Sequence, residues 1–118
     1  MSAGTSVAAL LKAGANINQQ DTVFQETALH KAVKYRMVDN MKHLLQAKAN
    51  PNYKDYIEET PLHKGAVNCK EAAIWTMLLK AGGFIHVRNS AGQTPLDKAL
   101  KTKNDIAIST MKQFRKKH

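Results

Sequence analysis

The stretch Thr60–Ala66, which reads TPLHKGA, decides how the whole chain is interpreted, because it occurs in three versions. It recurs as TALHKA at Thr27–Ala32 and as TPLDKA at Thr94–Ala99, at spacings of 33 and 34 residues. In a chain of 118 residues, self-similarity at a fixed period is typical of a protein built from stacked copies of one structural unit.

A second motif repeats out of phase with the first. It reads LLKAGAN at Leu10–Asn16, LLQAKAN at Leu44–Asn50 and LLKAGG at Leu78–Gly83, and its spacing is 34 residues both times. Two motifs that share one period indicate a repeat array over most of the chain.

The period and the two motifs resemble those of the ankyrin repeat over residues 5 to 114. The resemblance implies an all-α fold, an ankyrin-repeat solenoid of helix-turn-helix units joined by β-hairpin-like loops. It also implies a single domain over residues 1–118. The expected units are a partial first repeat at 5–26, a second repeat at 27–59, a third repeat at 60–93 and a C-terminal capping repeat with a basic tail at 94–118. The partial repeat is either a natural half-cap or part of a longer array.

Local signals place the helices independently of the resemblance. Thr60 and Thr94 each precede a proline, a combination that caps and begins a helix, whereas Gly14 and Gly82 suit helix ends. We expect helices at Ser6–Ala13, Ala28–Tyr35, Val38–Ala47, Pro61–Asn68, Lys70–Ala81, Pro95–Thr102 and Asp105–Arg115.

The chain departs from the family pattern at its turns. Arg36 replaces the glycine usual between the two helices of a repeat, and Gln25 and Glu58 replace the loop-tip glycine that survives as Gly92. These replacements predict looser or differently shaped turns, because glycine is the residue that adopts a positive φ most readily.

Composition restricts the class of protein. Hydrophobic residues make up 43% and charged residues 23%, as in ordinary globular chains, and no apolar run approaches the length that spans a membrane. The N-terminus lacks the pattern of a secretory signal. The single cysteine, Cys69, cannot form an internal disulfide. We therefore expect a monomer in the cytoplasm or nucleus.

The sequence signals no catalytic, metal or cofactor site. The resemblance implies that His30 and His63 bond the motif threonine and nearby backbone, and Cys69 has no partner that signals a nucleophile. No glycine-rich nucleotide motif occurs. The remaining histidines are not at metal-ligand spacing: His43, His86 and His118. We predict that the chain is not an enzyme and needs no cofactor.

The resemblance implies that partners bind to a concave face, formed by the loop tips and the exposed side of each repeat's first helix. The fifth residue of the motif, directly after its histidine or aspartate, is Lys31, Lys64 or Lys98 in successive repeats, which predicts a row of lysines about 10 Å apart. Charge would guide the encounter and aromatic rings would supply buried area. The candidate partner-binding residues are Phe24, Lys31, Lys34, Tyr35, Tyr53, Tyr56, Lys64, Asn68, Arg88, Lys98 and Lys101.

The sequence therefore predicts a non-enzymatic module that binds an acidic segment or surface of another protein. We expect charge reversal of the three aligned lysines to weaken binding without changing helicity. The alternative is that these lysines only keep the protein soluble.

The net charge of +9 is uneven, because residues 98–118 contribute +6 of it. This basic end is either a solvated helix cap or a nuclear-localisation or phosphate-contacting tail. Other functions stay open: the recruitment portion of a larger enzyme, a host-directed pathogen effector, or nucleic-acid binding through the C-terminal repeat.

Overall fold

The computed structural model describes residues 16–117, apart from the side chains of Asn68 and of residues 115–117. The described part contains helices and no strand, so the predicted all-α architecture is confirmed. The predicted helix at Ser6–Ala13 lies outside the described residues. The helices are α2 (Ala28–Lys34), α3 (Val38–Gln46), α4 (Pro61–Asn68), α5 (Ala72–Lys80), α6 (Pro95–Lys101) and α7 (Asp105–Lys117).

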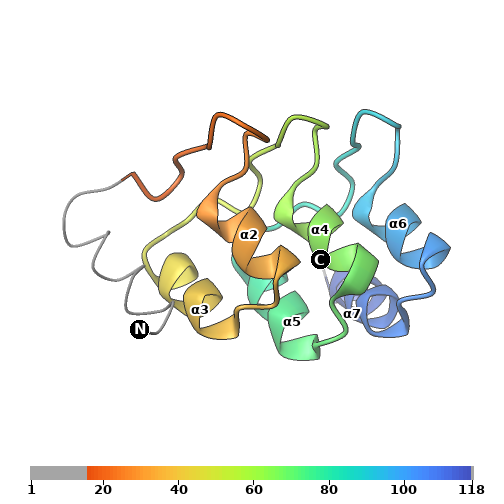
Figure 1. The fold of residues 1–118 in the computed structure, drawn as a ribbon. Helices are drawn as coiled ribbons and strands as arrows, with labels where there is room; N and C mark the ends of the chain where they lie inside the picture. Colours follow the sequence, from red (N-terminus) through yellow and green to blue (C-terminus); the bar gives the residue numbers. More distant parts are fainter. Residues whose placement is uncertain (1–15, 118) are drawn as a thin grey trace.

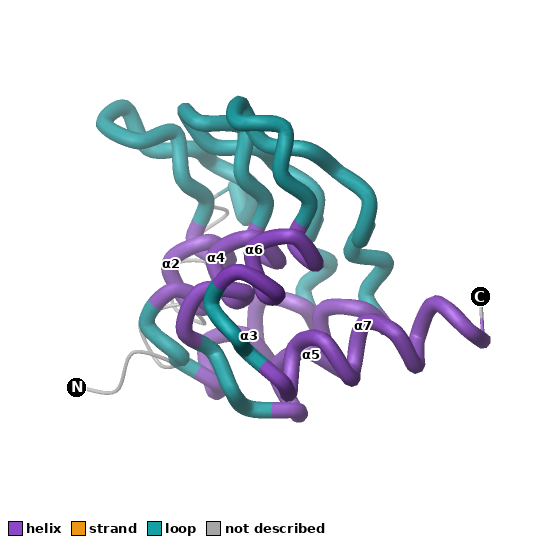
Figure 2. The backbone as a smooth tube through the Cα atoms, turned by 90° about the vertical axis from the view of Figure 1, so that its right-hand side faces the viewer, coloured by secondary structure: helices purple, strands orange, loops and turns teal. Residues whose placement is uncertain are grey.

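The helices form two rows, with three loops projecting from one end of the molecule (Figure 1). The first row consists of α2, α4 and α6, and the second row of α3, α5 and α7, as the side view in Figure 2 shows. Each repeat contributes one helix to each row, so equivalent residues of successive repeats become spatial neighbours. We call the segments that precede α2, α4 and α6 the first loop (residues 16–27), the second loop (47–60) and the third loop (81–94).

Hydrogen bonds of the motif histidines cap the starts of α2 and α4 and tie the repeats together. In His30, Nδ1 accepts from the Thr27 N–H at 3.1 Å, so Nε2 carries the hydrogen and donates to the Glu59 carbonyl at 2.8 Å. His63 repeats this arrangement with the carbonyl of Gln93 at 2.9 Å. The structural role expected of both histidines is confirmed. Burial lowers the pKa of both imidazoles, so both are neutral at pH 7.

The core lies between the two rows and is continuous across the repeats. Its largest fully buried side chain is Trp75, whose indole N–H donates to the carbonyl of Cys69 at 2.9 Å. Gly65 makes room for this ring, because a Cβ there would lie 3.2 Å from Trp75 and 3.1 Å from Val33. The glycine that interrupts the TPLHKGA motif is thus explained by the tryptophan that the same repeat carries.

The expectation of looser turns is wrong. Gln25 and Glu58 have φ angles of 56° and 62°, in the same left-handed region as Gly92 at 79°, and Arg36 has a φ of 55°. A side chain in this conformation costs roughly 1–2 kcal/mol. The packing of the repeats keeps the shape of these turns despite this energetic cost. The positions where another residue replaces glycine carry exposed polar side chains.

Candidate functional site

The three loops share one hydrogen-bonded frame built on an aspartate or an asparagine. In the second loop, Asp55 Oδ1 accepts from the N–H groups of Ile57 and Glu59 at 3.0 and 2.9 Å, and the Asp55 N–H donates to the Glu59 carbonyl at 2.9 Å. Asp21 and Asn89 occupy the same place in the first and third loops. Such short polar side chains stabilise tight turns through bonds to the backbone that follows them.

Acidic side chains of the first two loops face lysines of the first-row helices. Glu26 and Glu59, each directly before a motif threonine, are 3% exposed at their side chains, and the Asp55 side chain is fully buried. Buried carboxylates remain charged only where cations or hydrogen bonds compensate them. We call the group that results the ionic cluster: Glu26, Asp55, Glu59, Lys64 and Lys98.

Lys64 is the centre of the ionic cluster. Its Nζ lies 2.6 Å from Asp55, 3.1 Å from Glu59 and 3.9 Å from Glu26, and its side chain is only 12% exposed. Burial opposes the charge of Lys64, but the two nearer carboxylates outweigh it and raise the pKa of the ammonium group. Lys64 is therefore a charged group inside the protein's own network.

Lys98 extends the ionic cluster to the last repeat by pairing with Glu59, which also accepts from the side-chain amide of Asn89 at 2.9 Å. Burial disfavours the charged form of Glu59. Hydrogen bonds from Lys98, Asn89 and Lys64 outweigh that effect and lower the pKa of Glu59 to about 2. One carboxylate thus joins the second loop to two first-row helices.

Lys31 is paired at the surface instead. Its Nζ lies 2.9 Å from Asp21, and its side chain is 48% exposed. The hydrogen bond from Lys31 lowers the pKa of Asp21 to about 2 and raises the pKa of Lys31.

The row of lysines is present, but all three ammonium groups are hydrogen-bonded to carboxylates of the same chain. The expectation that charge reversal of the three lysines leaves helicity unchanged is revised. A glutamate at position 64 would add a fourth carboxylate to the buried ionic cluster.

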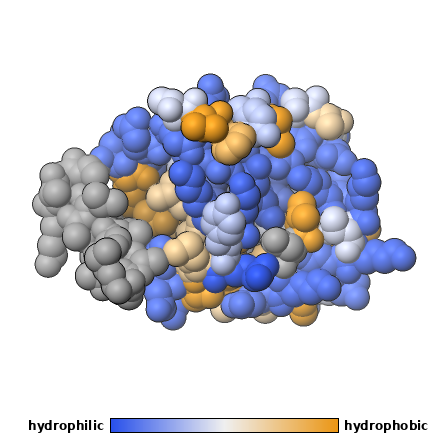
Figure 3. Space-filling view, viewed as in Figure 1, coloured by the Kyte–Doolittle hydropathy of each residue, from blue (hydrophilic) through white to orange (hydrophobic). Residues whose placement is uncertain are grey.

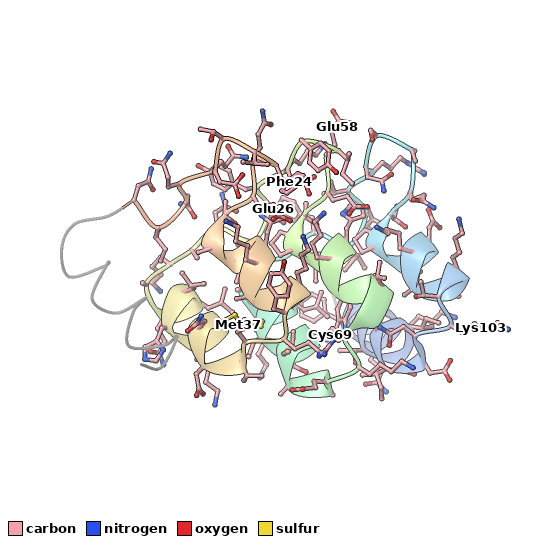
Figure 4. The ribbon with its side chains drawn as sticks, viewed as in Figure 1. Phe24, Glu26, Met37, Glu58, Cys69 and Lys103 are labelled. Atoms are coloured by element: carbon pink, nitrogen blue, oxygen red, sulfur yellow. The ribbon has the colours of Figure 1, made fainter. Side chains whose placement is uncertain are left out.

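Lys34 lies among aromatic side chains. Its Nζ lies 5.8 Å from the ring centroid of Phe24 and 5.5 Å from that of Tyr35, and Phe24 packs against Tyr56 with centroids 5.3 Å apart. The nearest carboxylate of Lys34 is Glu26 at 3.6 Å, a distance too long for a hydrogen bond. Four of the candidate residues, from two loops and from α2 with its C-terminal end, therefore meet in one place. Figure 4 shows Phe24 and Glu26 close together above α2 and Glu58 at the tip of the second loop.

The other candidates lie apart from this group. Tyr53 is half-buried, and Arg88 is exposed and donates to the Gly92 carbonyl at 2.8 Å. Lys101 is exposed on α6 and forms no ion pair with any part of the chain that the structure describes. The side chain of Asn68 lies outside the described residues.

The carboxylates of the ionic cluster are the residues that sequence reasoning missed. A signal for them exists: Asp21, Asp55 and Asn89 recur at a spacing of 34 residues, and Glu26 and Glu59 at 33. Aligning the loops as well as the helices would have placed acidic residues opposite the lysines.

No group of three potential metal-ligating side chains occurs among the described residues. Cys69 is fully buried, and burial raises the pKa of its thiol, which is the reverse of what a nucleophilic cysteine needs. None of the helices in the described range is long and apolar enough to cross a bilayer.

Comparison with known proteins agrees with the architecture of repeated helix pairs. A family model for ankyrin repeats (3 copies) matches residues 2–89. The chain is 37% identical over 84 residues to neurogenic locus notch homolog protein 1 of Mus musculus, a match covering 70% of this chain and 3% of that protein. It is 31% identical over 111 residues to ankyrin repeat and SOCS box protein 6 of Mus musculus, a match covering 93% of this chain and 27% of that protein. The chain thus spans less than a third of the length of either relative.

Proposed function

Because the chain belongs to the ankyrin repeat family, we propose that it is a non-enzymatic protein-interaction module that binds an acidic segment or surface of a partner protein through its concave face. That face consists of the three loops and the exposed sides of α2, α4 and α6. Ankyrin repeats serve generally as protein-binding units, and the acidic partner is our own extension of that role.

The observation that carries the proposal is the position of the exposed apolar side chains. Among the described residues, seven of the eight large hydrophobic side chains that are exposed lie in the three loops or on α2, α4 and α6 with their C-terminal ends. Leu100 stands apart from this set, because its equivalents in α2 and α4, Val33 and Ala66, are buried in the core. Exposed apolar groups concentrated on one set of loops and helices are typical of a binding surface. The seven are Val23, Phe24, Tyr35, Tyr56, Val67, Phe84 and Leu100.

The charge preference rests on Lys34 and Lys101, which occupy equivalent positions in the first and last described repeats. Val67 holds that position in the repeat between them and is 44% exposed. An apolar side chain with a lysine in the repeat on either side complements a partner that carries acidic groups around an apolar one. The internally paired Lys64 and Lys98 contribute little to this preference.

Affinity capture with matched variants tests the proposal. We expect Lys34→Glu/Lys101→Glu to lose partner proteins that the wild type retains. The control, Lys42→Glu/Lys80→Glu, makes the same charge change at exposed residues of α3 and α5 and should retain those partners. The proposal fails if all three chains retain the same proteins, or if the control loses them equally.

A second candidate function is the recruitment portion of a longer protein. It is favoured by the small share of each relative that the chain covers. Detection of the natural protein with an antibody raised against residues 16–117 tests this candidate. A species larger than 118 residues supports it, and a species of that size alone contradicts it.

A further inference from the structure

A patch of exposed aromatic rings lies across the first two loops and the C-terminal end of α2. Phe24, Tyr35 and Tyr56 are 45%, 62% and 55% exposed, and together with Lys34 they form what we call the aromatic patch. Figure 3 shows hydrophobic residues at the top of the molecule, over the loops, and also at the left and in the lower part, within a mainly hydrophilic surface. Single exposed apolar residues need no explanation, but a contiguous group of rings does.

The aromatic patch is held in place by the backbone beneath it. The Tyr56 N–H donates to the Phe24 carbonyl at 3.0 Å, which joins the two loops directly below their rings. The Phe24 N–H donates in turn to Asp21 Oδ1 at 2.8 Å. Rings whose backbone is fixed before binding lose little conformational freedom when a partner docks, so they suit a role as anchors.

Lys34 supplies the one cation of the aromatic patch, and its ammonium group is less engaged than those of the neighbouring Lys31 and Lys64. Lys31 and Lys64 lie within hydrogen-bond distance of a carboxylate, at 2.9 and 2.6 Å, whereas Lys34 lies 3.6 Å from Glu26. Its N–H donors are therefore open to a carboxylate of a partner, and the two rings near it reduce its contact with water.

We infer that the aromatic patch binds a short acidic segment of the partner protein, with an apolar side chain seated on Phe24 and Tyr56 and a neighbouring carboxylate on Lys34. This inference rests on the proposed function and adds the chemistry of the recognised segment. The two partner groups must lie about as far apart as Lys34 Nζ and the Phe24 centroid, which are 5.8 Å apart. Residues i and i+2 on one face of an extended segment are about 6–7 Å apart and meet this requirement.

A nucleic acid is the competing occupant, because bases stack on exposed rings and phosphates pair with lysines. A polyanion needs several free cations along its path. The aromatic patch offers only Lys34, and the carboxylates of Glu26 and Asp21 lie beside it. One cation among acidic groups fits a single carboxylate better than a phosphate backbone.

Synthetic peptides of defined sequence test the inference. The probe is a short Gly/Ser peptide with a central Glu-Ser-Trp, and its two controls carry Glu-Ser-Ala or Lys-Ser-Trp. Binding is followed by the shifts of backbone amide resonances of the chain. We expect the probe to shift the amides of Phe24, Lys34 and Tyr56, and each control to bind about fivefold or more weakly.

Variants of the chain complete the test. Phe24→Ala should weaken binding of the probe by about fivefold or more. Phe84→Ala removes a ring that is more exposed than Phe24, at 60%, from the third loop and should leave binding unchanged. The inference is overturned if the probe does not bind, if Phe24→Ala binds it like the wild type, or if a short single-stranded oligonucleotide binds more tightly. These outcomes leave the proposed function standing, because the capture experiment with Lys34→Glu/Lys101→Glu decides that question separately.

Discussion

The second and third loops have the same hydrogen-bonded frame and different charges. Asp55 and Asn89 make equivalent bonds to the backbone that follows, and each N–H donates to a carbonyl at 2.9 Å. Yet the second loop carries buried Glu59 where the third carries the neutral Gln93. The carboxylates are therefore not needed for the shape of the loop, and their role is to compensate the lysines of the helices behind them.

The difference explains where the net positive charge remains. Lys98 reaches back to Glu59 of the second loop, because its own loop offers no carboxylate at that place. Lys101 has no ion pair among the described residues. Residues 98–118 thus contribute +6 of the net charge of +9.

The largest change in the free energy of unfolding is expected from a substitution at the most highly charged part of the second loop. Lys64→Met removes the cation that faces three carboxylates and should lower the free energy of unfolding by about 3 kcal/mol. Urea denaturation measures this change. Lys42→Met, at an exposed position on α3, should change stability by less than about 0.5 kcal/mol. Equal effects of the two variants would show that the ionic cluster has no special role.

A smaller effect is expected at Glu59. Glu59→Gln should cost about 1–2 kcal/mol at pH 7, because Asp55 and Glu26 still pair with Lys64. The pKa of Glu59 is lowered from 4.5 to about 2, so its contribution is complete above pH 4.5 and is lost as the pH falls through this window. The stability of the variant should therefore converge with that of the wild type below pH 4.5.

The neighbouring residue provides the control for Glu59. Glu58→Gln makes the same change at an exposed loop tip, and it should leave both the stability and its pH dependence close to those of the wild type. A gap that stays constant between wild type and Glu59→Gln as the pH falls would contradict the low pKa assigned to Glu59.

The motif histidines give a further contrast between the repeats. Their replacement should change the free energy of unfolding by less than Glu59→Gln does. Burial lowers the pKa of His30 and His63 below 6.5 in the folded chain. As the pH falls, the two imidazoles are therefore protonated in the unfolded chain before they are protonated in the folded one, so the free energy of unfolding falls as the pH drops below 6.5. The C-terminal repeat has Asp97 at this place and has no such response there. In His30→Gln/His63→Gln, the loss of stability between pH 7 and pH 5 should be smaller than in the wild type. An equal loss would show that other groups cause it.

The smallest effect is expected from making the third loop resemble the second. Gln93→Glu adds a carboxylate at the loop position that Glu59 holds in the second loop, and it should raise the free energy of unfolding by at most about 0.5 kcal/mol. Thermal unfolding measures the change. A loss of more than about 1 kcal/mol would mean that the frame of the third loop requires a neutral side chain.

Much of the fold was predictable because the repeat period transfers local signals from one repeat to the next. The threonines at 27, 60 and 94 each begin a first-row helix, as their N-cap chemistry indicates. The predicted start at Lys70 lies two residues before the observed start of α5 at Ala72. The spacing from Thr60 to the start of α5 is one residue longer than that from Thr27 to the start of α3. Gln25 and Glu58 keep the left-handed turn that glycine favours, so repeat packing outweighs the conformational preference of a single residue there.

The candidate site was only partly predictable from the sequence. The row at Lys31, Lys64 and Lys98 follows from the period, but the state of each ammonium group depends on side chains from other repeats. Lys98 and Glu59, for example, are 39 residues apart in the chain. Contacts between repeats decide whether a lysine is available to a partner, and a pattern within one repeat does not contain them.

The central claim is that Lys64 acts inside the protein, through the carboxylates of the second loop. A double-mutant cycle of Lys64→Met and Glu59→Gln, measured by urea denaturation at pH 7, tests it most directly. The account predicts that the two changes are coupled by roughly 1–2 kcal/mol, because each removes the partner of the other. A coupling energy within about 0.3 kcal/mol of zero would contradict it and would return Lys64 to the set of residues available for a partner.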